Sequence, residues 1–371
     1  MPPRKRSGGP AKRGLRRYWW RFLLVALIVY AGYTVWNGGA LRSTKAFVAG
    51  QCLAVEAPVG PEDLVMLPDG SGAIVSAQDR RHPNAPGALW YYSLNTRPGQ
   101  FTKLGIPANL PLHPGGISLF RGGDGQIFLH VINHRSEDRH TVEIFTLQDD
   151  GNGGHILHHR GSVSSSLFVH PNAIAAVGPE AFYVTNDRGS GPHWMHMVEN
   201  LLQLSRATVD YYDGRGVRIV AKDIAFANGI DVTADGGTVL VGSTLWRELL
   251  AFTRDPGSGF LLRSGTLALP GGPDNIHRDA EGNIWVAAHP NAFAFIGHAI
   301  DGDRQSPSMV LRIGRGSNGV LQVQEAFGDP GSLISGASAA AQINNRLLIG
   351  ATFQPKLLDC QFEPAKLRSA Q

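Results

Sequence analysis

Six segments of this 371-residue chain follow one pattern: a polar or glycine residue, a short apolar strand, a turn and a second apolar strand. One example is DIAFANGIDVTADGGTVLVG at residues 223–242, where Asp235-Gly236 is a hairpin turn signal beside a β-branched run. The segments start 47 to 61 residues apart, at Glu62, Gly116, Asn172, Asn228, Asn275 and Gly336. A strand–turn–strand unit repeated six times at this period predicts an all-β fold, a six-bladed β-propeller.

The stretches between these segments supply the remaining strands of each blade. ALWYYSL, HTVEIFTL, GVRIVAKD, ELLAFTR and SMVLRIG are apolar or alternate between apolar and polar residues, which is typical of outer strands. Residues 191–212 differ, and we expect a short helical insert there. Its apolar residues recur at a rough helical spacing: Trp194, Met197, Leu201, Leu204 and Val209.

The N-terminal 21 residues carry much of the positive charge of the chain. They contain eight of its 34 Lys and Arg residues and no acidic residue, so the rest of the chain is mildly acidic. We therefore expect no nucleic-acid partner, which would need a basic face on the folded domain. Residues 22–36 carry no charge, and Trp19, Trp20 and Trp36 flank them as aromatic residues flank a membrane span.

This segment predicts an uncleaved signal-anchor with a cytoplasmic N-terminus. A cleaved signal peptide is the alternative, with a weak cleavage site at Gly38-Gly39-Ala40, and a buried core helix is a third interpretation. The expected organisation is a basic cytoplasmic tail at 1–21, a transmembrane signal-anchor at 22–37, a linker at 38–50 and a six-bladed propeller domain at 51–365.

The predicted anchor places the catalytic domain outside the cytoplasm. The chain has no Asn-x-Ser/Thr glycosylation site, which favours a bacterial periplasm over a secreted or lumenal eukaryotic location. Its two cysteines, Cys52 and Cys360, lie near the two ends of the exported part. In an oxidising compartment they suggest one disulfide that closes the ring, and two unrelated buried thiols are the alternative.

Polar side chains recur where the first strand of a blade begins. In a propeller these strand ends point toward one mouth of the central channel, so two carboxylates and three carboxamides are expected to converge there. This oxygen-only set suits Ca²⁺. An Asn before a strand is also common as a turn former, which is the alternative for each residue alone. The predicted calcium ligands are Glu62, Asn172, Asn228, Asp274 and Asn275.

At these residues the chain resembles the paraoxonase/arylesterase family, calcium-dependent six-bladed propellers that hydrolyse lactones and aryl esters. The resemblance runs from Cys52 to Cys360 and is carried by EDLVMLPDG, HPGGIS, VINH, HPNAIAAVGPEAFYVTND, DIAFANGI, PDNI, HPN and LLIGATF. It implies a catalytic calcium on the same five residues. It also implies a second, structural calcium on Asp63, the carbonyl of Ile117 and an aspartate at position 173. Here residue 173 is alanine, so the second ion is left open.

The resemblance further implies a histidine dyad above the catalytic calcium. One member corresponds to His134, and the other falls at Gly115, which has no side chain. His113 lies two residues earlier and is a candidate substitute, and His289 corresponds to another family histidine near the mouth. A structural or surface role is the alternative for all three histidines. We expect a solvated loop rather than a metal site at residues 155–159, which contain three more histidines.

These observations predict a calcium-dependent hydrolase of lactones or aryl esters. In this prediction Ca²⁺ polarises the substrate carbonyl, and His134, Glu62 or Asp274 activates water as general base. The expected partners are a small lactone or ester and, through the N-terminal helix, a membrane. The alternatives are a gluconolactonase- or phosphotriesterase-like propeller hydrolase with another substrate, and a membrane-anchored propeller that binds calcium without catalysis.

Overall fold

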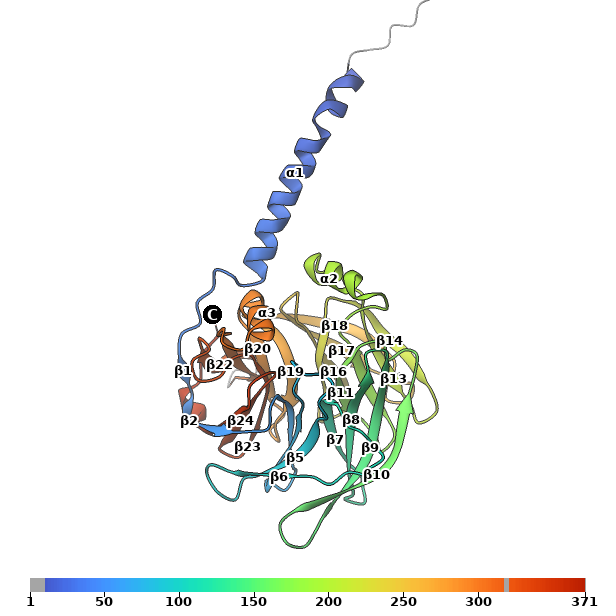
Figure 1. Cartoon of the computed structure of the whole chain (residues 1–371), viewed down its shortest axis with the longest axis vertical. Coiled ribbons are helices and arrows are strands. Elements are labelled where there is room, and N and C mark those ends of the chain that lie inside the picture. Colours follow the sequence, from blue (N-terminus) through green and yellow to red (C-terminus); the bar gives the residue numbers. More distant parts are fainter. Residues whose placement is uncertain (1–10, 317–319, 371) are drawn as a thin grey trace, which may run out of the picture.

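Six antiparallel sheets surround a central axis in the computed structural model of the chain (Figure 1). The sheets lie within residues 11–316 and 320–370, which are the residues that the structure describes. Each sheet forms one blade, and the first strands of neighbouring blades contact one another in a closed ring. The predicted six-bladed β-propeller is therefore confirmed.

Five blades are built from consecutive strands. The first contains β3 (Pro61–Met66), β4 (Gly72–Ala77), β5 (Ala88–Ser93) and β6 (Gln100–Lys103). The second contains β7 (Pro114–Arg121), β8 (Ile127–Ser136), β9 (Arg139–Asp149) and β10 (His155–Ser164). The third contains β11 (Pro171–Ala176), β12 (Phe182–Asn186), β13 (Ala207–Tyr212) and β14 (Val217–Ile224). The fourth contains β15 (Ala227–Val232), β16 (Thr238–Ser243), β17 (Glu248–Arg254) and β18 (Leu261–Ala268).

The fifth blade is larger, because two short terminal strands extend it. Its four consecutive strands are β19 (Gly272–Arg278), β20 (Ile284–His289), β21 (Ser308–Arg315) and β22 (Leu321–Asp329). The additional strands β1 (Phe47–Val48) and β26 (Arg368–Ser369) both pair with β22.

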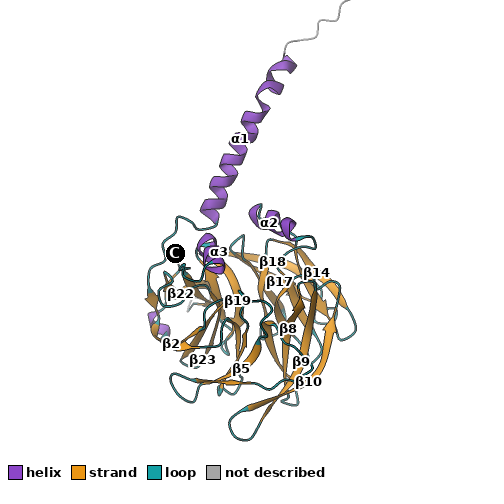
Figure 2. Cartoon of the chain, viewed as in Figure 1, coloured by secondary structure: helices purple, strands orange, loops and turns teal. Residues whose placement is uncertain are grey.

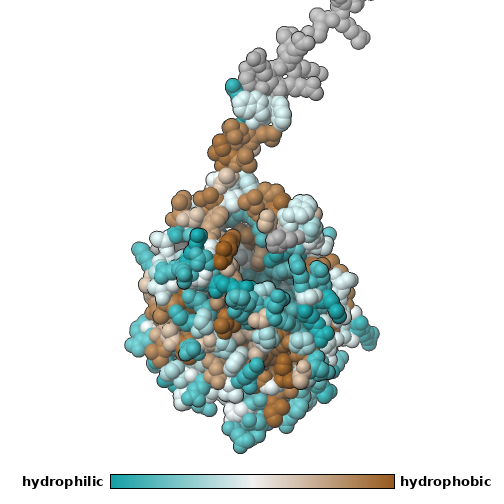
Figure 3. Space-filling model, in the orientation of Figure 1, coloured by the Kyte–Doolittle hydropathy of each residue, from teal (hydrophilic) through white to brown (hydrophobic). Residues whose placement is uncertain are grey.

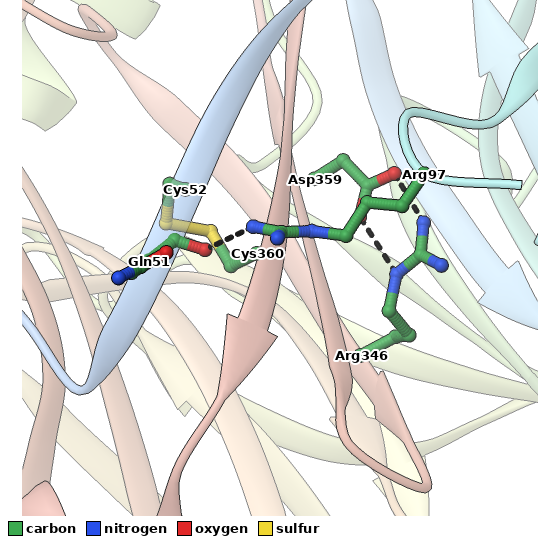
Figure 4. The surroundings of a disulfide bond; sticks show 6 residues. All are labelled: Gln51, Cys52, Arg97, Arg346, Asp359 and Cys360. Carbon is green, nitrogen blue, oxygen red and sulfur yellow. Dashed lines mark hydrogen bonds and ion pairs between the residues drawn. A yellow bond between two sulfur atoms is a disulfide. The ribbon is translucent and has the colours of Figure 1, made fainter.

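The sixth blade closes the ring with strands from both ends of the propeller. It contains β23 (Ala337–Ile343), β24 (Arg346–Ala351), β25 (Lys356–Phe362) and, as its outermost strand, β2 (Gly50–Glu56). Cys52 and Cys360 lie opposite each other in the β2–β25 pair and form a disulfide, as predicted. Figure 4 shows this bond beside two polar contacts: the Arg97–Gln51 hydrogen bond, which ties the first blade to the sixth, and the Arg346–Asp359 ion pair, which lies within the sixth blade.

Apolar cores lie between adjacent blades. Between the third and fourth blades, for example, Tyr183 and Val209 pack in one buried cluster with Ile230 and Val241. Full burial of one such side chain stabilises the fold by about 1.5–3 kcal/mol. These cores hold the first strands in fixed positions around the axis. They therefore also fix the positions of the side chains at the starts of these strands.

Three helices lie at one end of the propeller (Figure 2). They are α1 (Ala11–Asn37), α2 (His193–Leu201) and α3 (Ala292–Ile300), and a short η1 (Pro364–Lys366) follows the last blade. Helix α1 extends away from the propeller, and the part at Trp19–Asn37 is long and apolar enough to cross a membrane. Its apolar side chains are exposed, with Phe22 at 71% and Val29 at 66%. Residues 1–10 of the predicted basic tail lie outside the described residues.

Three predictions about local structure need correction. The helical insert is shorter than expected, because α2 ends at Leu201 and Val209 belongs to β13, where it is fully buried between blades. The stretch from His155 to His159 is part of β10, not a loop. Helix α3 was not predicted. Its sequence is almost entirely apolar, so it has no helical period, although Asn291 caps it by accepting a hydrogen bond from the N–H of Ala294.

Candidate functional site

A cavity of about 640 Å³ opens at the end of the propeller that carries the three helices. Four of the five predicted calcium ligands line it: Glu62, Asn172, Asn228 and Asp274. The fifth, Asn275, is buried beside them, and its Nδ2 donates a hydrogen bond to the carbonyl oxygen of Glu62 at 3.2 Å. The structure thus brings together the residues that the repeat placed at the same position in four blades.

Irregular strand pairing explains why these polar residues occur at strand starts. The pairing between the first and second strand of each of these blades shifts register at the leading end, and a shift of this kind re-aims side chains. The shifts fall at Pro61/Asp63, Pro171/Ile174, Ala227/Ile230 and Pro273/Ile276. The glycine after Asn228 has a related role, since a Cβ on Gly229 would overlap the carbonyl oxygen of Asp274 on the next blade.

The carboxamides at the cavity have oxygens without partners. Oδ1 of Asn172 and Oδ1 of Asn228 are buried and accept no hydrogen bond. The amide of Asn172 is oriented by its Nδ2, which donates to Oδ2 of Asp187 at 3.2 Å. Because a buried polar atom without a partner is costly, two such oxygens in one cavity are suited to contact a hydrogen-bond donor or a cation.

The two carboxylates differ in their surroundings. Burial raises the pKa of Glu62 to about 7, Asp274 and Asp63 add to the rise, and Arg80, which forms an ion pair with Glu62, opposes it. Oδ2 of Asp274 accepts a hydrogen bond from Nε2 of His289 at 2.8 Å. Among the described residues no cluster of three or more His, Cys, Asp or Glu side chains suits a metal ion. The candidate set is instead two carboxylates with three carboxamides, and its donors fit a hard cation such as Ca²⁺.

His134 lines the cavity and is paired with another histidine. Its Nδ1 lies 3.1 Å from Nδ1 of His140, which faces it across the β8–β9 hairpin. Burial lowers the pKa of His134 well below its usual value, and it also lowers the pKa of His140. Both rings are therefore neutral near pH 7. The partner of His134 is His140, which was not predicted from the sequence.

The two other predicted histidines have different environments. His113 accepts a hydrogen bond from Nε2 of Gln78 at 3.0 Å and does not line the cavity. His289 lines the cavity, donates to Asp274 and stacks on Phe295 with 3.9 Å between the ring centroids. The structure therefore places His289 in contact with a predicted calcium ligand, whereas it keeps His113 outside the cavity.

His170 and Asp187 also belong to the site, although the sequence analysis did not single them out. His170 lines the cavity, and its Nδ1 lies 2.8 Å from Oδ1 of Asp187. Burial opposes the charge of Asp187, but His170 and Arg188 hold the pKa of this carboxyl below its usual value. A His-Pro pair stands at the start of the first strand in the second and third blades, at 113 and 170, and this recurrence was a signal for His170.

The residues implied for a second calcium, Asp63, Ile117 and Ala173, lie in the first strands β3, β7 and β11, and none of them lines the cavity. Asp63 is 2% exposed, and its Oδ1 accepts a hydrogen bond from Nε2 of His277 at 2.7 Å. Oδ2 of Asp63 accepts one from the N–H of Ile117 at 2.8 Å. Although burial of the His277 ring opposes its charge, Asp63 and then Asp231 raise the pKa of His277.

The end of helix α1 forms part of the cavity lining. Asn37 donates from Nδ2 to the carbonyl oxygen of Leu245 at 2.8 Å, and its own carbonyl accepts from Nη1 of Arg247 at 3.0 Å. The carbonyl of Gly38 accepts from the N–H of Ala292, the first residue of α3, at 2.9 Å. Figure 3 shows apolar surface on α1 and on the adjoining end of the propeller. Apolar side chains line the cavity there: Met197, Leu201, Phe226, Phe293, Phe295 and Ile296.

Comparisons with known proteins agree with this geometry. The family model "Arylesterase" matches residues 51–362. The chain is 31% identical to serum paraoxonase/arylesterase 1 of Homo sapiens over 333 residues, which cover 87% of this chain and 92% of that protein. It is 30% identical to serum paraoxonase/arylesterase 2 of Rattus norvegicus over 311 residues, 80% of this chain and 85% of that protein.

Solved structures resemble the chain in fold alone. A regucalcin from Agrobacterium tumefaciens, described as a calcium-binding protein, aligns with a TM-score of 0.50 at 16% identity. The alignment covers 89% of this chain and 98% of that structure. A luciferin-regenerating enzyme aligns with a TM-score of 0.50 at 13% identity, over 86% of this chain and 97% of that one. Both similarities agree with the propeller architecture.

Proposed function

Since the chain belongs to the arylesterase family, we propose that it is a calcium-dependent hydrolase of lactones or aryl esters. The observation that carries the proposal is the pair of buried carboxamide oxygens, Asn172 Oδ1 and Asn228 Oδ1, which have no partner in a cavity that also contains two carboxylates. Calcium is the cation that this set of donors suits best, because carboxylates and neutral amide oxygens are its usual protein ligands.

The proposed ligands are the five residues at the strand starts: Glu62, Asn172, Asn228, Asp274 and Asn275. When bound, calcium supplies the positive charge that stabilises the oxyanion developing on the substrate carbonyl. Burial raises the pKa of Glu62 to about 7, and the ion pair with Arg80 opposes this rise. Asp187 orients the amide of Asn172, and His289 orients the carboxylate of Asp274.

His134 is the proposed general base. If its Nδ1 carries the hydrogen and donates to His140, its Nε2 has a free lone pair and accepts a proton from the attacking water. The water oxygen then bonds to the carbonyl carbon. When the acyl–oxygen bond breaks, the leaving oxygen takes the proton back from His134. The pKa of His134, lowered well below its usual value by burial, keeps the ring unprotonated and available at neutral pH.

The other candidate bases have competing contacts. Glu62 is bound by Arg80, and Asp274 by His289, so each carboxylate already serves as a hydrogen-bond or ion-pair acceptor. His113 bonds to Gln78 and does not line the cavity. For these reasons we assign the base to His134 and positioning roles to His140 and His289.

The cavity lining favours substrates with an apolar group. Apolar residues from α2, α3 and the strand connections surround the approach to the polar floor. Burial of one methylene group on binding contributes about 0.8 kcal/mol, so each added carbon of an acyl chain increases affinity until the cavity is filled. We propose that the chain hydrolyses lactones or esters with a hydrophobic substituent.

Helix α1 is proposed as a membrane anchor that keeps the catalytic domain outside the cytoplasm, in a bacterial periplasm. The support is the apolar, exposed segment at Trp19–Asn37, which follows a basic N-terminus. Because Thr34, Asn37 and Gly38 line the cavity, the anchor would also keep the cavity close to the membrane surface.

A calcium titration of hydrolysis tests the proposed function. The full chain, purified in detergent and stripped with EDTA, is assayed against a series of lactones and phenyl acetate as calcium is returned. We expect activity to appear with calcium. Asn228→Ala should weaken calcium binding by about 100-fold, and Asn228→Asp, which keeps a ligand oxygen, should retain binding.

Thermal melting of each variant separates loss of the ion from loss of the fold. If the parent hydrolyses none of these substrates at any calcium concentration while it melts cooperatively, the enzymatic proposal fails. If it hydrolyses them equally well in EDTA, the calcium part of the proposal fails.

A further inference from the structure

We infer that the side chain of His277 takes the place of a second, inner calcium ion, so that this chain holds calcium only at the cavity. The inference rests on the proposed function for the cavity ion but makes a separate claim about the channel. The family resemblance implies an inner ion at Asp63, Ile117 and residue 173. The residues present there do not fit it.

Asp63 has no free oxygen to offer a cation. Its Oδ1 accepts hydrogen bonds from Nε2 of His277 at 2.7 Å and from the N–H of Leu64 at 2.9 Å. Its Oδ2 accepts from the N–H of Ile117 at 2.8 Å. A buried carboxylate needs compensation of this kind, and here an imidazole and two backbone amides provide it.

The other two residues implied as ligands of the inner calcium ion do not suit it either. Residue 173 is alanine, 4% exposed, so it offers no side-chain oxygen, and its backbone N–H donates to Oγ1 of Thr185 at 3.0 Å. The contact that Ile117 makes with Asp63 is through its N–H, whereas the implied ligand is its carbonyl, and a donor directed at the carboxylate repels a cation in that place. Calcium takes six to eight oxygen ligands, and this location offers one carboxylate that is already bound.

The contrast with the cavity supports the same conclusion. There, Asn172 and Asn228 each have a buried Oδ1 without a hydrogen bond. At Asp63 both carboxylate oxygens have partners, and one of these partners is a side chain with a titratable nitrogen. The chain thus leaves two amide oxygens without a partner in the cavity, whereas it leaves neither oxygen of Asp63 without one.

The number of bound ions tests the inference without reference to activity. The full chain in detergent is equilibrated with excess calcium, passed through a desalting column and analysed for calcium and protein by elemental mass spectrometry. We expect one ion per chain, and none in Asn228→Ala. Two ions per chain would overturn the inference, whereas no ion in the parent would leave it standing and overturn the proposed function instead.

A single ion must also be located, because the inner site alone would give the same count. If Asn228→Ala keeps its ion while Asp63→Asn loses it, the ion lies in the channel and the inference is wrong. The parent count needs no variant, so this part of the test does not depend on how well either variant folds.

A gain of the second site tests the role of His277 directly. Ala173→Asp with His277→Asn supplies a carboxylate and removes the imidazole bond from Oδ1 of Asp63, and we expect this double variant to bind two ions. The single variants are the matched controls and should bind one. A folded double variant that binds one ion would contradict the substitution of His277 for calcium, since removal of the ring and restoration of the acid would then not create a site.

Discussion

The imidazole of His134 occupies the space that a side chain at position 115 would need. A Cβ built on Gly115 would lie 2.8 Å from Nε2 of His134. The absence of a side chain at position 115 therefore leaves room for the His134 ring, whose Nδ1 faces Nδ1 of His140. The site has one histidine pair, and its second member comes from the neighbouring strand.

Gly115→Ala should therefore lower activity by displacing the His134 ring. A methyl group so close to Nε2 forces the ring to move, and we expect kcat/KM to fall about tenfold or more, because misplacement of a base by an ångström is costly. Gly105→Ala is the matched control, since a Cβ there meets nothing within 4 Å. Hydrolysis kinetics with a lactone measure the effect on activity, and thermal melting measures the effect on stability. Equal activity of both variants would show that the position of His134 does not matter.

The pH dependence of hydrolysis should report the neutral state of His134. Burial, Arg80, His140 and His170 lower the pKa of His134 from 6.5, and only Asp187 acts in the opposite direction. A base is active when unprotonated, so at saturating calcium, which favours the ionised form of Glu62, activity should be constant above pH 6.5 and fall only when the pH drops through the lower pKa of His134 in the folded protein.

The acid limb of the pH profile, in which kcat/KM falls as the pH is lowered, measures the pKa of His134. His134→Gln should lower the rate by about 100-fold or more and remove that limb, while His140→Asn should shift it. An acid limb centred above pH 6.5 would contradict the assignment of the base.

The positions of the proposed calcium ligands could be predicted from the sequence because the pattern that marks them is local. A strand, a turn and a second strand fall within about twenty residues, so the repeat correctly placed Asn172 and Asn228 at the starts of their strands, whereas β19 begins at Gly272, three residues before Asn275. The repeat did not indicate the register shifts that turn these side chains toward the cavity. Those shifts depend on contact with the neighbouring strand.

Features that depend on packing between segments were missed. Val209 has helical spacing relative to Leu201, yet burial between two blades places it in a strand. The partnership of His134 with His140 depends on the β8–β9 pairing, although a histidine at each end of the short segment HRSEDRH was a usable signal. The contact of His277 with Asp63 joins residues 214 positions apart, and no local pattern predicts it.

His289 should matter for calcium affinity more than for folding. Its Nε2 donates to Asp274, and a residue that orients a metal ligand in this way typically contributes 10- to 100-fold in affinity. His289→Phe keeps the stacking on Phe295 but loses the donor, so we expect about a tenfold rise in the calcium Kd. His289→Gln retains a donor and is the control. Calorimetric titration measures both, and an unchanged Kd in the Phe variant would exclude the positioning role.

The N-terminal helix should remain on the mature protein. Gly38 and Gly39 suggested a weak cleavage site, but in the structure a Cβ on Gly39 would overlap the carbonyl oxygen of Pro290, and Gly39 has φ of +74°. Close packing therefore explains why glycines occur here, and no cleavage site is needed to explain them. Intact mass measured on membrane-extracted protein should include residues 1–37, and a mature N-terminus near Ala40 would contradict the prediction.

Removal of the disulfide should weaken the fold but not the cavity. The bond joins the outermost strand pair of the sixth blade and closes a loop of 308 residues, for which chain-entropy models give roughly 5 kcal/mol. Backbone pairing of β2 with β25 continues on both sides of the bond, so the double variant Cys52→Ser/Cys360→Ser should still close the ring and hydrolyse substrate at 25 °C. Its urea midpoint should fall to that of the reduced parent, and reductant should not lower it further. A double variant as stable as the oxidised parent would show that the disulfide does not stabilise the fold.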